Sequence, residues 1–281
     1  MTIATRRYTL ANGTMVPKIG FGTWQVPDGP SAYNAVTSAL QAGYRHIDTA
    51  HAYRNESSVG RAIIDSGLAR EDIFLTTKLP AAVKTYDQTH QSFTDSLRLL
   101  GADYVDLYLI HWPWPLDQPG TDYTSGNAEA WRAMEELLSE GRARALGVSN
   151  FSAADIDSLL QTATVPPHVN QIKFYIGHTQ PGLTAYCQAH NIQIEGYSPL
   201  ATGSILNKPE LADIAARYGK SVAQLSIRYV IQRGVVPLPK TTTPSRMVEN
   251  LDIDFTLTDA DMDTLNAVVD DAPTPGAPIF P

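Results

Sequence analysis

The segment "RHIDTAHAYRNESSVGRAIIDSG", residues 45–67, joins a short apolar run to an amphipathic pattern. Its first part, residues 45–50, has the length and composition of a buried strand. In residues 56–67 the apolar side chains Val59, Ile63 and Ile64 recur at helical spacing and predict the stripe that packs inward. A strand followed directly by a helix is the building unit of α/β folds with a parallel sheet.

The same unit recurs along the chain. The first copy has a strand at residues 18–22 and a helix at residues 31–43, where Ala32, Val36, Ala39 and Leu40 share a face and Gly43 ends the helix. Eight such units at intervals of about thirty residues predict a (β/α)8 barrel of the TIM type, with apolar strands covered on their outer side. The further strands are expected at residues 72–79, 104–112, 144–150, 168–172, 192–198 and 235–240, each followed by a helical segment.

The residues before the first unit, 8–18, form a different pattern. "YTLANGTMVPK" reads as a β-hairpin with Asn12 and Gly13 at its turn, and we expect this hairpin to cover the bottom of the barrel. No low-complexity linker divides the sequence, so residues 1–281 are expected to form a single domain that ends in a short tail, residues 272–281.

A doubly wound open sheet is the alternative fold. Such a sheet normally carries a G-x-G-x-x-G pattern at its first turn, and "GFGTWQ", residues 20–25, breaks the pattern at its last position. The barrel is therefore the preferred prediction.

Composition restricts the function classes. A net charge of −8 argues against nucleic acid or an anionic membrane as the main partner. The single cysteine, Cys187, excludes an internal disulfide framework and fits a reducing compartment. No signal peptide is readable in "MTIATRRYTL", and no run of eighteen apolar residues suggests a membrane span. A cytoplasmic enzyme is expected.

Polar residues stand at the carboxyl ends of three predicted strands. Asp48 ends the second strand, Lys78 the third and His111 the fourth, while Tyr53 lies in the loop after Asp48. Each residue alone has an ordinary structural interpretation, such as a turn cap or a satisfied core histidine. The carboxyl ends of barrel strands converge on one mouth, and the four together therefore predict an active site.

The chemistry of such a group can be derived from its side chains. A nearby ammonium favours a phenolate, so we expect Lys78 to lower the pKa of Tyr53 and Asp48 to hold the lysine in place. His111 could hydrogen-bond the oxygen of a bound carbonyl. A phenol of this kind would protonate an alkoxide as it forms, and the hydride would have to come from a nicotinamide cofactor.

Three segments resemble the signatures of the aldo-keto reductase family: residues 43–56, "VDLYLIHWP" at 105–113 and "PKTTTPSRMVENL" at 239–251. The resemblance spans nearly the whole chain and is strongest to the bacterial 2,5-diketo-gluconate reductase branch. It implies that Asp48, Tyr53, Lys78 and His111 form a catalytic tetrad with Tyr53 as proton donor. A histidine at the fourth position is what family members that reduce C=O groups carry.

The resemblance also implies a site for a nicotinamide dinucleotide. Ser149, Asn150 and Gln171 are expected to bind the carboxamide, because amide side chains offer both a donor and an acceptor, and Tyr197 is expected to stack on the ring. Ser149 and Asn150 have an alternative interpretation as helix caps. The other cofactor contacts that the resemblance implies are Thr23, Ser198, Leu200, Thr241, Glu249 and Asn250.

Two cations, Lys240 and Arg246, flank "TTTPS" near a helix N-terminus and make a site for an anion. In the family this site takes the 2′-phosphate of NADPH, so a preference for NADPH over NADH is expected.

The substrate pocket is expected to be built from Trp24, His51 and Trp112, whose aromatic rings suggest an apolar wall around a small carbonyl. Trp114 could belong to the pocket or to the packing of the barrel. Small aldehydes, α-keto esters, dicarbonyls and keto-sugars are all compatible substrates. The chain departs from common family patterns at Lys173 and Ala201, and this leaves the loops after the sixth and seventh strands unspecified.

Three competing functions were weighed. A metal-dependent hydrolase would need clustered ligands, and no His-x-His pair occurs, so no metal is expected. A short-chain dehydrogenase would need Tyr-x-x-x-Lys, which is absent. A non-enzymatic NADPH-binding subunit is disfavoured by the intact tetrad. The expected partner is therefore a small-molecule carbonyl, with no nucleic acid or membrane, and the enzyme is expected to be a monomer like many family members.

Overall fold

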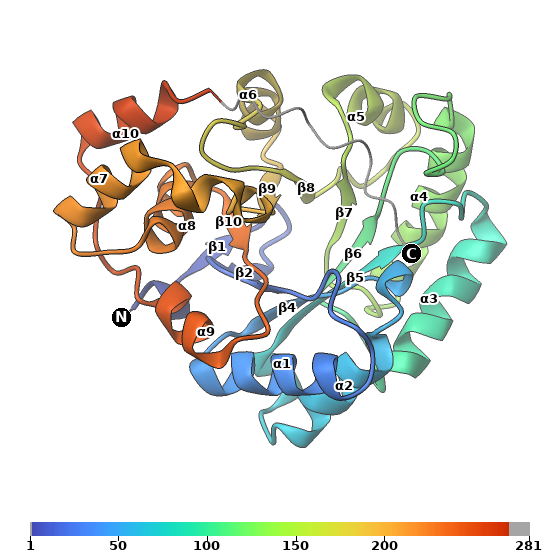
Figure 1. Ribbon diagram of the computed structural model, residues 1–281. Helices are drawn as coiled ribbons and strands as arrows, with labels where there is room; N and C mark the ends of the chain where they lie inside the picture. The colour runs from blue at the N-terminus through green and yellow to red at the C-terminus, as the bar shows by residue number, and fades with distance from the viewer. Residues whose placement is uncertain (1, 270–281) are drawn as a thin grey trace.

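The computed structural model describes residues 2–269, so the expected tail at residues 272–281 lies outside the described residues. Eight parallel strands form the central sheet, and helices surround it (Figure 1). The strands are β3 Phe21–Gly22, β4 His46–Asp48, β5 Phe74–Leu79, β6 Leu107–Ile110, β7 Leu146–Ser149, β8 Val169–Lys173, β9 Gln193–Tyr197 and β10 Val236–Leu238.

Backbone hydrogen bonds at both ends of the strand order close the sheet into a barrel. Neighbouring strands pair in parallel from β3 to β10, and the amides of Gly20 and Gly22 donate to Pro237 O and Pro239 O at 3.0 Å. A Cβ atom on Gly20 would lie 2.5 Å from Leu238 Cδ2 and 2.7 Å from His46 Nδ1, and one on Gly22 would lie 3.3 Å from Leu238 O, so glycine at both positions favours the close approach of the two segments. The barrel prediction is confirmed, and the doubly wound alternative is excluded.

The helices follow the strands in the expected order, with one addition. Between β9 and β10 the chain forms a 3-10 segment, Ala201–Asn207, and two α-helices instead of one. The α-helices are α1 Pro30–Ala42, α2 Glu56–Asp65, α3 Tyr86–Leu100, α4 Thr124–Ser139, α5 Ala153–Leu160, α6 Pro181–Ala189, α7 Pro209–Arg217, α8 Val222–Gln232, α9 Pro244–Leu251 and α10 Asp259–Asn266. None of the described helices is long and apolar enough to cross a membrane.

Helix α2 corrects one detail of the expected inner stripe. Val59 and Ile63 are buried, but the side chain of Ile64 is 61% exposed. The interior position is taken by Gly60, because a Cβ there would collide with the carbonyl group of Leu100 at the end of α3. The close approach of α2 and α3 therefore leaves Ile64 on the outer surface of this helix pair.

Strands β1 Arg7–Thr9 and β2 Met15–Pro17 form the expected antiparallel hairpin. Its turn is closed by the Leu10 amide, which donates to Thr14 O at 2.8 Å, and Gly13 adopts a φ of +86°, which glycine tolerates. Leu10 and Val16 pack in one apolar cluster with the first residues of four barrel strands: Phe74, Leu107, Val169 and Val236. The hairpin thus covers the amino-terminal end of the barrel, and the carboxyl end is left for the site.

Candidate active site

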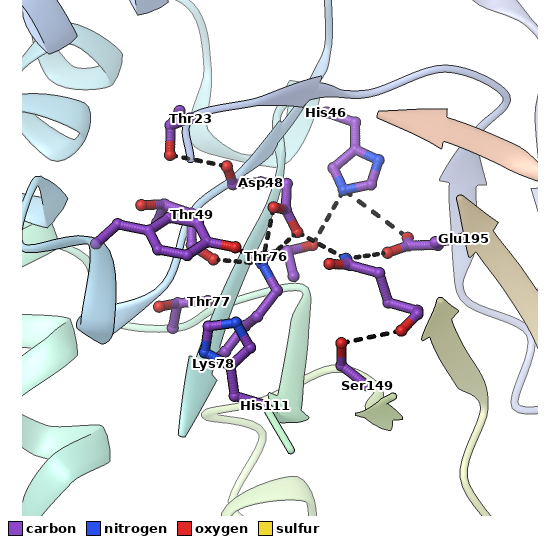
Figure 2. A network of polar contacts seen from close by, with 12 residues as sticks. Thr23, His46, Asp48, Thr49, Thr76, Thr77, Lys78, His111, Ser149 and Glu195 are labelled. Atoms are coloured by element: carbon purple, nitrogen blue, oxygen red, sulfur yellow. Dashed lines mark hydrogen bonds and ion pairs between the residues drawn. The ribbon is translucent and has the colours of Figure 1, made fainter. Parts of the chain in front are cut away.

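Three residues of the predicted tetrad, Asp48, Lys78 and His111, lie close together in one polar network (Figure 2), and Tyr53 contacts Lys78. Lys78 Nζ donates to Asp48 Oδ1 at 2.7 Å and Oδ2 at 2.8 Å, and to Thr49 O at 2.9 Å. The same ammonium lies 3.4 Å from the hydroxyl of Tyr53, which stands on the 3-10 turn His51–Tyr53. The rings of Tyr53 and His111 pack edge to face with their centroids 5.6 Å apart. The chain therefore brings all four side chains into one contact group.

Lys78 and Asp48 form an ion pair in the barrel interior. The lysine is fully buried and the aspartate is 4% exposed. An unpaired buried charge is costly, and the chelating geometry of the two carboxylate oxygens offsets that cost. The pair fixes a positive charge next to the phenol.

The pKa of Tyr53 shifts in the direction opposite to our expectation. Burial and the negative charge of Asp48 raise the pKa of Tyr53 well above its ordinary value. The expected lowering by Lys78 is wrong for the ligand-free protein, because Asp48 offsets the lysine charge and the ring is withdrawn from water. Tyr53 is therefore a protonated phenol at neutral pH.

His111 is also uncharged at neutral pH. Burial and the positive charge of Lys78 lower the pKa of His111 well below its ordinary value. A neutral imidazole can donate one hydrogen bond without adding a second buried cation beside the lysine.

Gln171 on β8 also contacts the tetrad, through Asp48. Its Nε2 donates to Asp48 Oδ2 at 2.8 Å and to Glu195 Oε2 at 2.9 Å, so both amide protons are used. No hydrogen bond from the described residues reaches its Oε1. Gln171 therefore offers an acceptor, and no spare donor, to a bound amide.

Ser149, Asn150 and Tyr197 form a second hydrogen-bonded cluster beside Gln171. Asn150 Nδ2 donates to His111 O at 3.1 Å and to Ser149 Oγ at 3.0 Å, and the Tyr197 hydroxyl donates to Asn150 Oδ1 at 2.8 Å. Neither Ser149 nor Asn150 caps the following helix. That role belongs to Ser152, which forms a capping box with Asp155.

The loop after β9 and the start of α9 lie where the phosphate groups of a dinucleotide were expected. Ser198, Ala201 and Thr202 have φ values of +51°, +48° and +55°, and Leu200 stands among them. Left-handed residues of this kind turn backbone amides inward and can form anion-binding concavities.

At α9, Lys240 and Arg246 are exposed, and neither forms an ion pair with any described residue. Together with the uncapped N-terminus of the helix, they leave room for an anion. Thr241 Oγ1 accepts from the amide of Thr243 at 3.1 Å and shapes this turn.

The remaining predicted cofactor residues have partners within the protein. Thr23 Oγ1 donates to Asp48 O at 3.0 Å, and Glu249 Oε1 accepts from Ser221 Oγ at 2.6 Å. Asn250 is 5% exposed and lies near the hydroxyl of Tyr44, which has no hydrogen-bond partner among the described residues. Among residues 2–269 no cluster of acidic, histidine or cysteine side chains could hold a metal ion.

The profile of the Aldo/keto reductase family matches residues 18–270. The chain belongs to the aldo-keto reductase family. Glyoxal reductase of Bacillus subtilis (strain 168) is 42% identical over 275 residues, which cover 96% of each chain. The crystal structure of an aldo/keto reductase from Brucella melitensis has a TM-score of 0.87 and 45% identity, covering 92% of this chain and 98% of that chain. A Bombyx mori aldo-keto reductase in complex with NADP has a TM-score of 0.84 and 37% identity, covering 92% and 91%.

On the substrate side of this aldo-keto reductase, Trp24, Trp112 and Trp114 are all partly exposed. Trp114 lines a cavity of about 210 Å³ between the loop after β6, the start of α4 and helix α5, and no tetrad residue lines this cavity, so it does not support a substrate-pocket role for Trp114. His51 Nδ1 lies 3.1 Å from Glu56 Oε2 and 3.3 Å from Ser96 Oγ, so helices α2 and α3 fix its ring. The hydrogen bond to Glu56 raises the pKa of His51.

A buried lysine that the sequence did not reveal supports Trp112. Lys84 Nζ donates to Trp112 O and to Asn127 Oδ1, both at 2.7 Å, and Asn127 Nδ2 donates to Pro113 O at 2.9 Å. Burial lowers the pKa of Lys84 to about 7. This clamp holds the loop that leaves the barrel directly after His111.

Sequence reasoning missed two further residues of the reductase. They form a buried polar network with Gln171 inside the barrel. Glu195 on β9 and His46 on β4 are fully buried, and His46 Nε2 lies 3.0 Å from Thr76 Oγ1 and 3.9 Å from Glu195 Oε1. The available signal was an ionisable residue inside each apolar strand, in "IQIEGYS" and "RHIDTA". Such residues in a barrel strand point to a polar network inside the wall.

Proposed function

We propose that this enzyme uses NADPH to reduce aldehydes and ketones to alcohols, with Tyr53 as the proton donor. The observation that carries the proposal is the single ammonium of Lys78, which contacts both Asp48 and the Tyr53 hydroxyl. These groups stand beside His111 at the face of the barrel where active sites are built. Membership of an oxidoreductase family supports the reaction class.

The residues present fit the cofactor. The free acceptor of Gln171 suits the amino group of a carboxamide, with Ser149 and Asn150 beside it, and we assign Tyr197 to stacking on the nicotinamide ring. Lys240 and Arg246 suit a 2′-phosphate, which only NADPH carries, and this supports NADPH over NADH. When bound, the nicotinamide supplies the hydride that no side chain can provide.

The chain's own residues perform the proton chemistry. The hydroxyl of Tyr53 and the imidazole of His111 would both hydrogen-bond the carbonyl oxygen, which polarises the bond and fixes its orientation. Tyr53 would give its proton to the oxygen as negative charge develops there. Lys78 then lies next to the new phenolate and stabilises it.

The substrate class is a small carbonyl compound. Partly exposed tryptophans at the mouth suit compact apolar or α-dicarbonyl molecules, and the bacterial relative named glyoxal reductase supports dicarbonyls among them. Keto-sugars and α-keto esters belong to the same group. We further propose that residues 1–281 act as a single-domain monomer in the cytoplasm.

The test is the loss of nicotinamide absorbance with a panel of small aldehydes, ketones and dicarbonyls, for the wild type and for Tyr53→Phe. We expect the variant to lose at least about a hundredfold in kcat, because general acid catalysis of this kind contributes that much or more. Its Kd for NADPH, measured by fluorescence quenching, should stay within about twofold. Tyr123→Phe, a substitution on the outer loop, is the matched control.

Two results would contradict the proposal. Tight NADPH binding without turnover of any carbonyl would indicate a binding subunit instead of an enzyme. Turnover by Tyr53→Phe close to the wild-type rate would move the proton donor to another residue.

A further inference from the structure

The side-chain amide of Gln171 is held between two carboxyl groups. One proton of Nε2 goes to Asp48 Oδ2 at 2.8 Å and the other to Glu195 Oε2 at 2.9 Å. A flipped amide would place its oxygen against the Asp48 carboxylate, which can only accept, so Asp48 fixes which end of the amide is the nitrogen. Glu195 Oε2 accepts the second amide proton and thereby sets the direction in which Gln171 Oε1 points.

The charges around Glu195 determine whether its carboxyl group is protonated. The cation in reach is Lys78 on β5, and it donates two hydrogen bonds to Asp48. His46 on β4 is neutral, because burial and the charges of Lys78 and Arg7 lower its pKa to about 3. Burial and the negative charge of Asp48 raise the pKa of Glu195 to about 8, while Gln171 and Lys78 oppose the shift. Val236, the residue that β10 pairs with Glu195, is uncharged.

Glu195 therefore carries a proton at neutral pH. It is fully buried, and its Oε1 has no hydrogen-bond partner among the described residues. Ionisation would place a second negative charge beside Asp48 with only one ammonium to serve both, and that charge would bind the phenolic proton of Tyr53 more tightly.

We propose that Glu195 is a positioning residue of the reaction, which fixes the Gln171 amide toward the cofactor carboxamide and keeps the Asp48–Lys78 pair aligned. The inference rests on the proposed function, since it assigns a task to the layer beneath the tetrad. Its neutral form is the working form. The rate of carbonyl reduction should consequently fall as the pH rises through about 8.

The experiment compares Glu195→Gln with Glu195→Leu across pH 6 to 9.5. Glu195→Gln keeps a neutral acceptor for Gln171, and we expect kcat within about threefold of the wild type at pH 7 without the decline near pH 8. Glu195→Leu removes the acceptor, and we expect Kd for NADP+ to rise and kcat to fall by about tenfold each. Asp261→Asn is the control, because Asp261 is another buried acid, bound to Arg217 and Tyr218 at helix α10, and its replacement should leave the decline near pH 8 in place.

A second readout does not depend on turnover. Infrared difference spectra between pH 6 and 9.5 should show the C=O stretch of a protonated carboxyl in the wild type and in Asp261→Asn, but not in Glu195→Gln. If that band is present but no carbonyl is reduced, the proposed function fails while the protonated Glu195 stands. A decline near pH 8 that persists in Glu195→Gln, or wild-type behaviour of Glu195→Leu, would overturn the proposal.

Discussion

Replacing Lys78 by methionine tests the ion pair at the centre of the site. Methionine keeps the length and the apolar stem but removes the ammonium that donates to Asp48 Oδ1, Asp48 Oδ2 and Thr49 O. Both partners are buried, so among the hydrogen bonds of the described residues the Asp48 carboxylate would keep that from the Gln171 amide. Breaking a buried pair by removing one partner costs about 3–5 kcal/mol.

The cost should depend on pH in a defined direction. At pH 5 the folded variant can neutralise Asp48 by binding a proton that the unfolded chain binds less readily. Where the folded state binds more protons than the unfolded state, stability falls as the pH rises. The deficit of Lys78→Met relative to the wild type should therefore be larger at pH 8 than at pH 5.

The assay is urea unfolding followed by circular dichroism and tryptophan fluorescence. For a chain of this size we expect the midpoint at pH 8 to fall by about 1–2 M. The double variant Asp48→Asn/Lys78→Met removes both charges and should recover most of the loss. Equal midpoints for the single and double variants at pH 8, or a deficit that does not change between pH 5 and pH 8, would refute the reasoning.

Two further predictions concern other parts of the molecule. In steady-state kinetics, Arg246→Ala should raise KM for NADPH by about tenfold, which corresponds to about 1.4 kcal/mol, and should change KM for NADH little. Equal effects on KM for NADPH and for NADH would contradict a 2′-phosphate site. Ile63→Ala should cost about 2–4 kcal/mol of stability because Ile63 is 6% exposed, whereas Ile64→Ala, at a site 61% exposed, should cost less than about 1 kcal/mol; equal losses in thermal melts would contradict the observed face of α2.

The fold was predictable because every strand–helix unit carries its own local signal. The hairpin turn at Asn12 and Gly13 was equally local. Closure of the barrel has no local signal, because it depends on contacts of Gly20 and Gly22 with β10, more than two hundred residues later. The same glycines looked like a broken dinucleotide motif in the sequence, and only the packing shows that they serve strand contact.

The tetrad could be placed from sequence because the carboxyl ends of barrel strands converge whatever the loops do. The pKa shifts of the tetrad residues could not be predicted from sequence, because a pKa depends on burial and on charges from distant segments. Glu195 was missed for a related reason. Its partner Gln171 and its competitor Asp48 come from β8 and β4, and no spacing along the chain joins them.

The raised pKa of Tyr53 alters the part that Lys78 plays in the proposed reaction. A phenol acidified in the resting state would lose its proton too early to donate it, whereas Tyr53 keeps its proton until the carbonyl oxygen becomes basic. The ammonium 3.4 Å away interacts weakly with the neutral phenol and strongly with the phenolate. Stabilisation that appears only as the proton leaves lowers the barrier without tightening the ground state. In the proposed reaction Lys78 would therefore act on the transition state, and the Asp48 carboxylate would prevent it from acting earlier.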